Sequence, residues 1–169
     1  MASEDCGIRI DVRAFPVGDT LVPRLIPPKN RLNRKNDRIV SLKLGLGAKI
    51  INVVCAYGPQ ARCTEEEKDT FWEEMDKELR IIPTRERVII EGDLNGPLGI
   101  STEGIKRVHG GWGVGERNDW GERVIDFAVA FDLATINTFF EKKINRLVTY
   151  RSSGRESHID LLLCKRETI

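Results

Sequence analysis

An aspartate and an asparagine stand two residues apart at the end of an apolar run, and together they could carry charge chemistry. In residues 88–95, Gly92-Asp93-Leu94-Asn95 closely follows three apolar residues. This pattern predicts a buried strand that ends in a turn. The Asp93 carboxylate can take a proton from water or bind a hard cation, and the Asn95 amide can orient a phosphate. A plain turn, in which both side chains only cap backbone groups, explains this segment alone equally well.

The elements that must position these side chains begin with a predicted hairpin. Apolar and polar residues alternate over 39–44, and a glycine-containing turn at 45–47 leads into the apolar run 50–57. We expect the second strand of this hairpin to be buried on both faces. Next, Thr64 and Glu67 form a capping box, and apolar residues at helical spacing predict a core-facing helix that ends at Pro83.

The second half of the chain predicts a loop, a helix and three strands. Residues 96–115 form a long glycine-punctuated stretch, and loops of that length are usually functional or mobile. Asp119 and Glu122 form a second capping pair before a helix that extends to about residue 131. Strand candidates follow at 134–139, 147–150 and 158–163. The mixture of elements indicates an α/β (α+β) fold.

Composition limits the function classes. The 169 residues suit one domain, and 27 Lys+Arg against 26 Asp+Glu leave a net charge of +1, so any polyanion must bind locally. The cysteines lack paired spacing, which favours reduced thiols. No apolar run approaches about 18 residues, so we expect no membrane partner and an intracellular location, nuclear or cytoplasmic. Basic residues cluster before the first predicted strand, at Arg24, Lys29, Arg31, Arg34, Lys35 and Arg38.

Several short motifs follow one another along the chain: Ala56-Tyr57-Gly58-Pro59, Gly92-Asp93-Leu94-Asn95, Gly115-Glu116-Arg117-Asn118, Asn137-Thr138-Phe139-Phe140, Val148-Thr149-Tyr150 and His158-Ile159-Asp160. In this order they resemble the endonuclease/exonuclease/phosphatase superfamily of metal-dependent phosphodiesterases. The resemblance is strongest to RTE-type retrotransposon endonuclease domains and to the craniofacial development protein 2-like proteins derived from them. It covers residues 36–166 and implies a deoxyribonuclease I-like two-sheet α/β sandwich, here incomplete. Residues 1–35 are then a poorly patterned N-terminal segment, and 36–169 a partial domain.

This resemblance assigns roles residue by residue. Asp93 would orient or deprotonate the attacking water, and Asn95 would help hold the scissile phosphate; both would lie at a Mg²⁺ site. Tyr57 would donate its phenol to the phosphate, although a tyrosine packed on the sheet is the simpler alternative. Asp160 would orient a histidine.

Two further positions, Arg117 and Asn118, would contact substrate, and a capping role before the following helix is equally compatible with them. His109 and His158 are more typical of structural histidines.

The sequence also departs from the resemblance. A metal-binding glutamate is expected before residue 36 and a catalytic histidine after Asp160, and neither is found in the sequence. We therefore expect a truncated, retrotransposon-derived, Mg-dependent DNA endonuclease-like phosphodiester hydrolase that is weak or inactive, with Mg²⁺ binding weak or lost. DNA is the expected partner, and the oligomeric state stays open. The alternatives are a non-catalytic module that binds nucleic acid or protein, and a gene remnant that does not fold stably.

Overall fold

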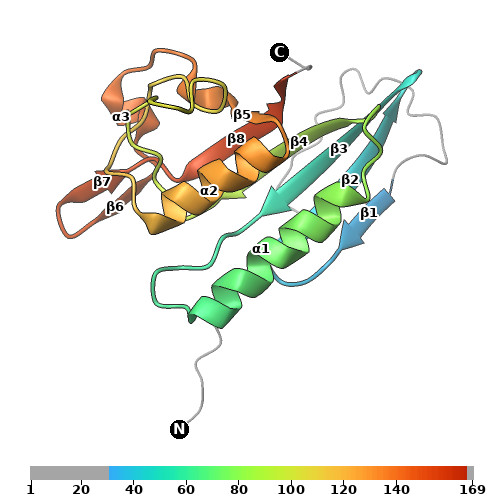
Figure 1. Ribbon diagram of the computed structural model, residues 1–169, viewed down its shortest axis with the longest axis horizontal. Coiled ribbons are helices and arrows are strands. Elements are labelled where there is room, and N and C mark those ends of the chain that lie inside the picture. The colour runs from blue at the N-terminus through green and yellow to red at the C-terminus, as the bar shows by residue number, and fades with distance from the viewer. Residues whose placement is uncertain (1–30, 167–169) are drawn as a thin grey trace, which may run out of the picture.

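A six-stranded mixed sheet organises the protein (Figure 1). The computed structural model describes residues 31–166. In spatial order the strands are β1 (Arg31–Arg34), β2 (Ile39–Leu46), β3 (Lys49–Ala56), β4 (Arg87–Asp93), β8 (Asp160–Lys165) and β5 (Leu133–Thr135). The other elements are α1 (Glu65–Arg80), α2 (Asp119–Ala130), the 3-10 turn η2 (Ile136–Thr138), α3 (Ile144–Leu147) and the hairpin β6 (Tyr150–Ser152) with β7 (Arg155–Ser157).

Two long helices cover the same face of this sheet, as Figure 1 shows for α1 and α2. Their apolar sides supply Phe71, Met75 and Val124 to one core with Val54 and Ile90 of the sheet. Helix α1 begins at the predicted capping box, in which Thr64 accepts from the Glu67 N–H and the Glu67 carboxylate accepts from Thr64. The predicted hairpin, the first helix and the mixed α/β class are therefore confirmed.

The topology brings three chain segments together at one end of the central strands. Strands β3 and β4 are parallel and are joined by α1, so their carboxyl ends lie together. Strand β8 runs antiparallel to β4, and it therefore begins where β4 ends. We call this end of the sheet, where β3 and β4 finish and β8 begins, the β3–β4 pole. It carries Tyr57, Asp93, Asn95 and Asp160.

Four sequence-based predictions need correction. Strand β3 is buried on one face only, because both long helices lie on that face and the alternate residues are half-buried. The cap of α2 is Asn118 rather than Asp119, since its side-chain oxygen accepts from the Gly121 N–H at 2.9 Å. Residues 136–138 form a 3-10 turn instead of extending a strand. Of the strand predicted at 147–150, Leu147 ends the short helix α3 and only Tyr150 lies in a strand, β6.

Strand β1 was not predicted, because the basic residues of 31–35 hide its alternation. It pairs with β2 from Arg31 opposite Lys43 to Arg34 opposite Val40. Predicted features of residues 1–30, including Cys6, Arg24 and Lys29, lie outside the described residues. Within residues 31–166, Cys55, Cys63 and Cys164 are free thiols. No helix in that range is both long and apolar enough to cross a bilayer.

Candidate active site

Backbone contacts lock the two strand ends of the β3–β4 pole together. The Gly58 N–H donates to the Asp93 carbonyl at 2.7 Å. Gly92 has φ +148°, and a Cβ there would lie 1.8 Å from the Ala56 carbonyl oxygen. A Cβ on Gly58 would approach the Leu94 carbonyl to 2.7 Å. Both glycines are therefore needed for the two chains to approach this closely.

Asp93 and Asn95 form a tight turn that aims their side chains. The Asn95 N–H donates to Oδ1 of Asp93 at 2.9 Å, and Asn95 adopts φ +53°, a conformation that asparagine tolerates well. The Asn95 amide donates through Nδ2 to the Gly58 carbonyl at 2.8 Å. Among the described residues, Oδ2 of Asp93 and Oδ1 of Asn95 have no partner, so two oxygens are left for a ligand.

Asp93 and Asp160 lie directly opposite each other on the antiparallel strands β4 and β8. Side chains at such positions share a face of the sheet, and their Cβ atoms are about 5 Å apart. Burial raises the pKa of Asp93 above its ordinary value, and the charge of Asp160 raises it further, against the opposing effect of the Asn95 N–H. The carboxylates repel each other, which is the arrangement that a bound cation or a shared proton relieves.

Two side chains hold Asp160 in place. Thr149 Oγ1 accepts from the N–H groups of Ile159 at 3.1 Å and Asp160 at 3.2 Å. Asn137 donates to the Asp160 carbonyl at 2.9 Å and accepts from the Leu162 N–H at 3.2 Å. Both residues occur in the sequence motifs that carry the resemblance, and their geometry assigns them a positioning role.

The Tyr57 hydroxyl is held by a residue of the segment that follows β3. The Gln60 amide donates to the Tyr57 hydroxyl at 2.8 Å, and the Arg38 guanidinium lies 5.6 Å from the ring centroid. Because the phenol oxygen accepts from Gln60, its own hydrogen is free to be donated to a ligand. Sequence reasoning did not identify Gln60 as a site residue. Its position three residues after Tyr57, past a Gly-Pro turn, is the signal that could have found it.

A pocket of about 240 Å³ opens beside the pole. Gln60, Asn95 and Asn118 line it together with the basic residues Lys68 and Arg123. Tyr57, Asp93 and Asp160 are not among its lining residues, and they connect to it through the contacts of Gln60 and Asn95. The pocket therefore extends the pole along one side and does not enclose all four predicted catalytic residues.

Arg117 and Asn118 hold the local structure. Arg117 donates to the carbonyls of Leu98 at 2.9 Å and Ser101 at 2.6 Å, which fixes the loop that follows Asn95. Asn118 caps α2 and also lines the pocket next to Asn95. Their predicted contact with substrate stays a prediction, and for Asn118 the capping role and the contact can operate at once.

Two substitutions separate these roles of Asn118. Asn118→Ala removes the cap and is expected to lower the free energy of unfolding by about 1 kcal/mol. Asn118→Asp keeps the cap, because aspartate is an equally good N-cap, but it places a negative charge in the pocket. Chemical denaturation should find the Asp variant as stable as the parent. Asn118→Asp should bind an oligonucleotide more weakly than the parent does. Equal binding by Asn118→Asp and the parent would show that Asn118 does not contact the substrate.

The two described histidines are buried beside the pole. Burial lowers the pKa of His109 to about 4, and burial likewise lowers the pKa of His158. Asn137 contacts Nε2 of His158 at 2.8 Å, which assigns the neutral tautomer in which Nε2 accepts. Neutral buried imidazoles are suited to a structural role.

The described residues contain no group of three or more His, Cys, Asp or Glu side chains that could hold a metal ion. The pole instead offers the facing carboxylates of Asp93 and Asp160 with the amide oxygen of Asn95. Mg²⁺ commonly binds through one or two carboxylates, retained waters and substrate phosphate. This donor set fits such an ion only when a phosphate is bound with it.

The chain is similar to known proteins in sequence and in fold. The chain is 32% identical over 136 residues to craniofacial development protein 2 of Tragulus javanicus and of Bos taurus, and the match covers 79% of this chain. It spans 23% of the length of those relatives. No family model matches the sequence.

Two solved structures have the same fold. The endonuclease domain of TRAS1, a telomere-specific non-LTR retrotransposon, superposes with a TM-score of 0.55 at 18% identity, over 82% of this chain and 55% of that one. An AP endonuclease from Archaeoglobus fulgidus gives 0.51 at 14% identity, over 85% and 60%. The predicted resemblance and the deoxyribonuclease I-like fold are thus confirmed.

Proposed function

We propose that this chain, which has the endonuclease/exonuclease/phosphatase fold, is a DNA-directed phosphodiester hydrolase domain of retrotransposon origin whose site is the β3–β4 pole. The reaction adds water across one P–O bond of the backbone and leaves a phosphomonoester and a hydroxyl. The single observation that carries the proposal is that the β3–β4 pole brings together Tyr57, Asp93, Asn95 and Asp160. These residues come from three chain segments, and hydrogen bonds hold the Tyr57 hydroxyl, the Asp93 and Asn95 side chains and the backbone of Asp160.

Asp93 is the group that takes the proton from water. Burial and the charge of Asp160 raise its pKa in the free protein, and its carboxylate is the proton acceptor that the Asn95 turn fixes in place. Its Oδ1 is occupied by the Asn95 N–H, and Oδ2 is the oxygen available to water. The Asn95 turn therefore orients the base as well as supplying an amide oxygen.

Tyr57 is the donor to the phosphoryl oxygen. Its hydroxyl is oriented by Gln60, and a fixed donor aimed at developing negative charge stabilises the transition state.

Asp160 shares a face with Asp93 and is held by Thr149 and Asn137. In this proposal, Asp93, Asn95 and Asp160 would hold Mg²⁺ together with the phosphate. When bound, the ion neutralises charge that builds on the phosphoryl oxygens. With only these ligands we expect weak binding of the ion and slow turnover.

Replacement of Tyr57 by Phe tests the donor directly. We expect the nicking of supercoiled plasmid in Mg²⁺ to slow by about 10–100-fold, because one transition-state hydrogen bond is lost while the ring keeps its packing. Tyr150→Phe is the matched control, since Tyr150 is the other tyrosine of the chain and is half exposed on β6. Equal rates for Tyr57→Phe and the parent would exclude a role for the phenol in the reaction.

A second candidate is a binding module without catalysis. The observation in its favour is that the described residues gather no set of three metal-binding side chains. The basic cluster predicted to serve such a module is divided in the fold: Arg34 pairs with Asp37, Lys35 with Glu78, and Arg38 lies over Tyr57. The binding module would be favoured by two results together: the parent protein binds DNA without nicking it, and Asp93→Asn binds DNA as well as the parent does.

A further inference from the structure

The sheet carries polar residues on its helix-covered face along β1 and β2. Figure 1 shows that these two strands lie on the side of the sheet away from α2. On β1 and β2, Arg31 stands opposite Lys43 and Asn33 opposite Ser41, and Asn52 follows on β3 opposite Lys43. These positions share the face of Ile39 and Val54, which are core residues. Asn52 is buried, Asn33, Ser41 and Lys43 are partly buried, and Arg31 is exposed at the mouth. Polar side chains that are withdrawn from water cost free energy unless they are hydrogen-bonded or occupied. Apolar residues would be the ordinary choice here.

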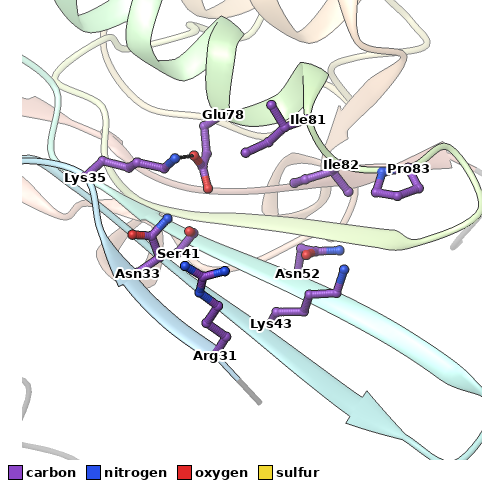
Figure 2. Close-up of a pocket in the computed structure, with 10 residues that line it drawn as sticks. All are labelled: Arg31, Asn33, Lys35, Ser41, Lys43, Asn52, Glu78, Ile81, Ile82 and Pro83. Carbon is purple, nitrogen blue, oxygen red and sulfur yellow. Dashed lines mark ion pairs between the residues drawn. The ribbon is translucent and has the colours of Figure 1, made fainter. Parts of the chain in front are cut away.

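These polar side chains form the floor of a pocket of about 340 Å³ (Figure 2). The wall opposite is the end of α1 and the turn after it, which contribute Glu78, Ile81, Ile82 and Pro83. The volume is at the lower end of the range typical of small-molecule sites. The pocket shares no lining residue with the one beside Asn95.

Two of its three basic residues are neutralised by buried carboxylates. Lys35 contacts Glu78 at 2.8 Å, and Lys43 contacts Glu86 at 2.8 Å. Glu86 also accepts from Asn52 at 2.9 Å; burial alone would raise its pKa, but these hydrogen bonds outweigh burial and hold the pKa below its usual value. Glu86 is thus held by Lys43 and Asn52, and Glu78 pairs with Lys35, so the contacts of these carboxylates are with groups other than Arg31.

Three polar side chains are left without a partner among the described residues: those of Arg31, Asn33 and Ser41. Figure 2 shows the Arg31 guanidinium directed toward Asn33 and Ser41, into the pocket. A guanidinium presents a planar fork of donors that matches a carboxylate in a bidentate manner, and the Asn amide and Ser hydroxyl add further donors beside it. Within residues 31–166, one positive charge of the pocket is uncompensated.

We propose that this pocket binds a small organic monoanion, with a carboxylate on Arg31, Asn33 and Ser41 and an apolar part against Ile81 and Ile82. One unpaired guanidinium matches one negative charge. A dianion such as phosphate is disfavoured, because Glu78 and Glu86 lie close to the same floor. The apolar wall adds affinity for a ligand that carries a short hydrocarbon chain.

Titration of the full chain with hexanoate, followed by ¹H–¹⁵N NMR, tests this proposal. We expect saturable shifts at Arg31, Asn33 and Ile82, and affinity for acetate and for inorganic phosphate that is weaker by about tenfold or more. Arg31→Gln should weaken hexanoate binding by about tenfold, since the bidentate contact is lost. Arg34→Gln is the matched control, because Arg34 lies on the same strand, faces away and pairs with Asp37.

Thermal unfolding keeps the comparison interpretable. Arg31 has no partner among the described residues, so Arg31→Gln should unfold at the temperature of the parent. Asn33→Ala offers a second variant of the same kind. Absence of saturable shifts with hexanoate, equal loss in the Arg34→Gln control, or tighter binding of phosphate than of hexanoate would each overturn the proposal.

Discussion

Asp93→Asn is expected to abolish phosphodiester hydrolysis and, at the same time, to make the fold slightly more stable at neutral pH. An amide cannot accept the proton of the attacking water, so the nicking rate should fall by about 10²–10⁴-fold. Asparagine keeps the oxygen that accepts from the Asn95 N–H at 2.9 Å, and the turn should therefore be preserved. The stability gain comes from removing a charge that burial and Asp160 disfavour.

The pH dependence of that gain has a defined sign. Because the folded-state pKa of Asp93 is raised, its contribution to stability is present in full below the unfolded-state pKa and is lost as pH rises through the folded-state pKa. Asp93→Asn should thus unfold with a free energy higher by about 0.5 kcal/mol at pH 7, a small effect because water screens a half-buried group. The difference should shrink on acidification below the folded-state pKa.

The matched control is Asp126→Asn, which removes a charge from the exposed face of α2. It should change neither the nicking rate nor the pH profile of stability. Urea denaturation at pH 7 and at pH 4 measures the stability of both variants. A loss of stability for Asp93→Asn at neutral pH would show that the carboxylate serves the fold and is not held ready for chemistry.

Gly92→Ala is expected to cause the largest loss of stability of any substitution considered for the pole. The added Cβ would lie 1.8 Å from the Ala56 carbonyl oxygen, which is a backbone atom of the neighbouring strand and cannot move aside alone. The positive φ of +148° adds strain. We expect a loss of about 3 kcal/mol or more, and a thermal midpoint lower by roughly 6 °C or more.

Gly47→Ala provides the comparison for that prediction. Gly47 also has a positive φ, +59°, but a Cβ there meets no atom within 4 Å. Its substitution should cost about 1 kcal/mol, from backbone strain alone. Calorimetric scans of both variants separate steric overlap from conformational strain. Similar losses for Gly92→Ala and Gly47→Ala would show that β3 and β4 are not held as closely as the structure describes.

Local rules in the sequence were enough to predict the hairpin, α1 and the strand that carries Asp93. Thr64 and Glu67 satisfy each other's backbone groups, which makes the start of α1 a short-range matter. The cap of α2 was placed one residue late, because Asn118 and Asp119 are both good caps and only the fold decides between them. Strand β1 is stabilised by its pairing with β2, and that contact leaves little local signal.

Most of the candidate site could be identified from sequence motifs, whereas its geometry could not. The parallel pairing of β3 and β4 brings Tyr57 beside Asp93 across more than thirty residues, and the antiparallel return of β8 places Asp160 opposite Asp93. The role of Gln60 depends on a turn that folds it back to the Tyr57 hydroxyl. The pocket at Arg31 depends on three strands and the end of α1, and no local pattern encodes it.

The ¹³C resonance of the Asp93 carboxyl carbon, followed against pH with and without Mg²⁺ and a dinucleotide, tests the central claim most directly. We expect the pKa of Asp93 to lie above the ordinary aspartate value in the free protein. It should fall when Mg²⁺ and the phosphodiester are added together, because a cation favours the charged carboxylate. A pKa at or below the ordinary value that does not respond to either addition would contradict the claim.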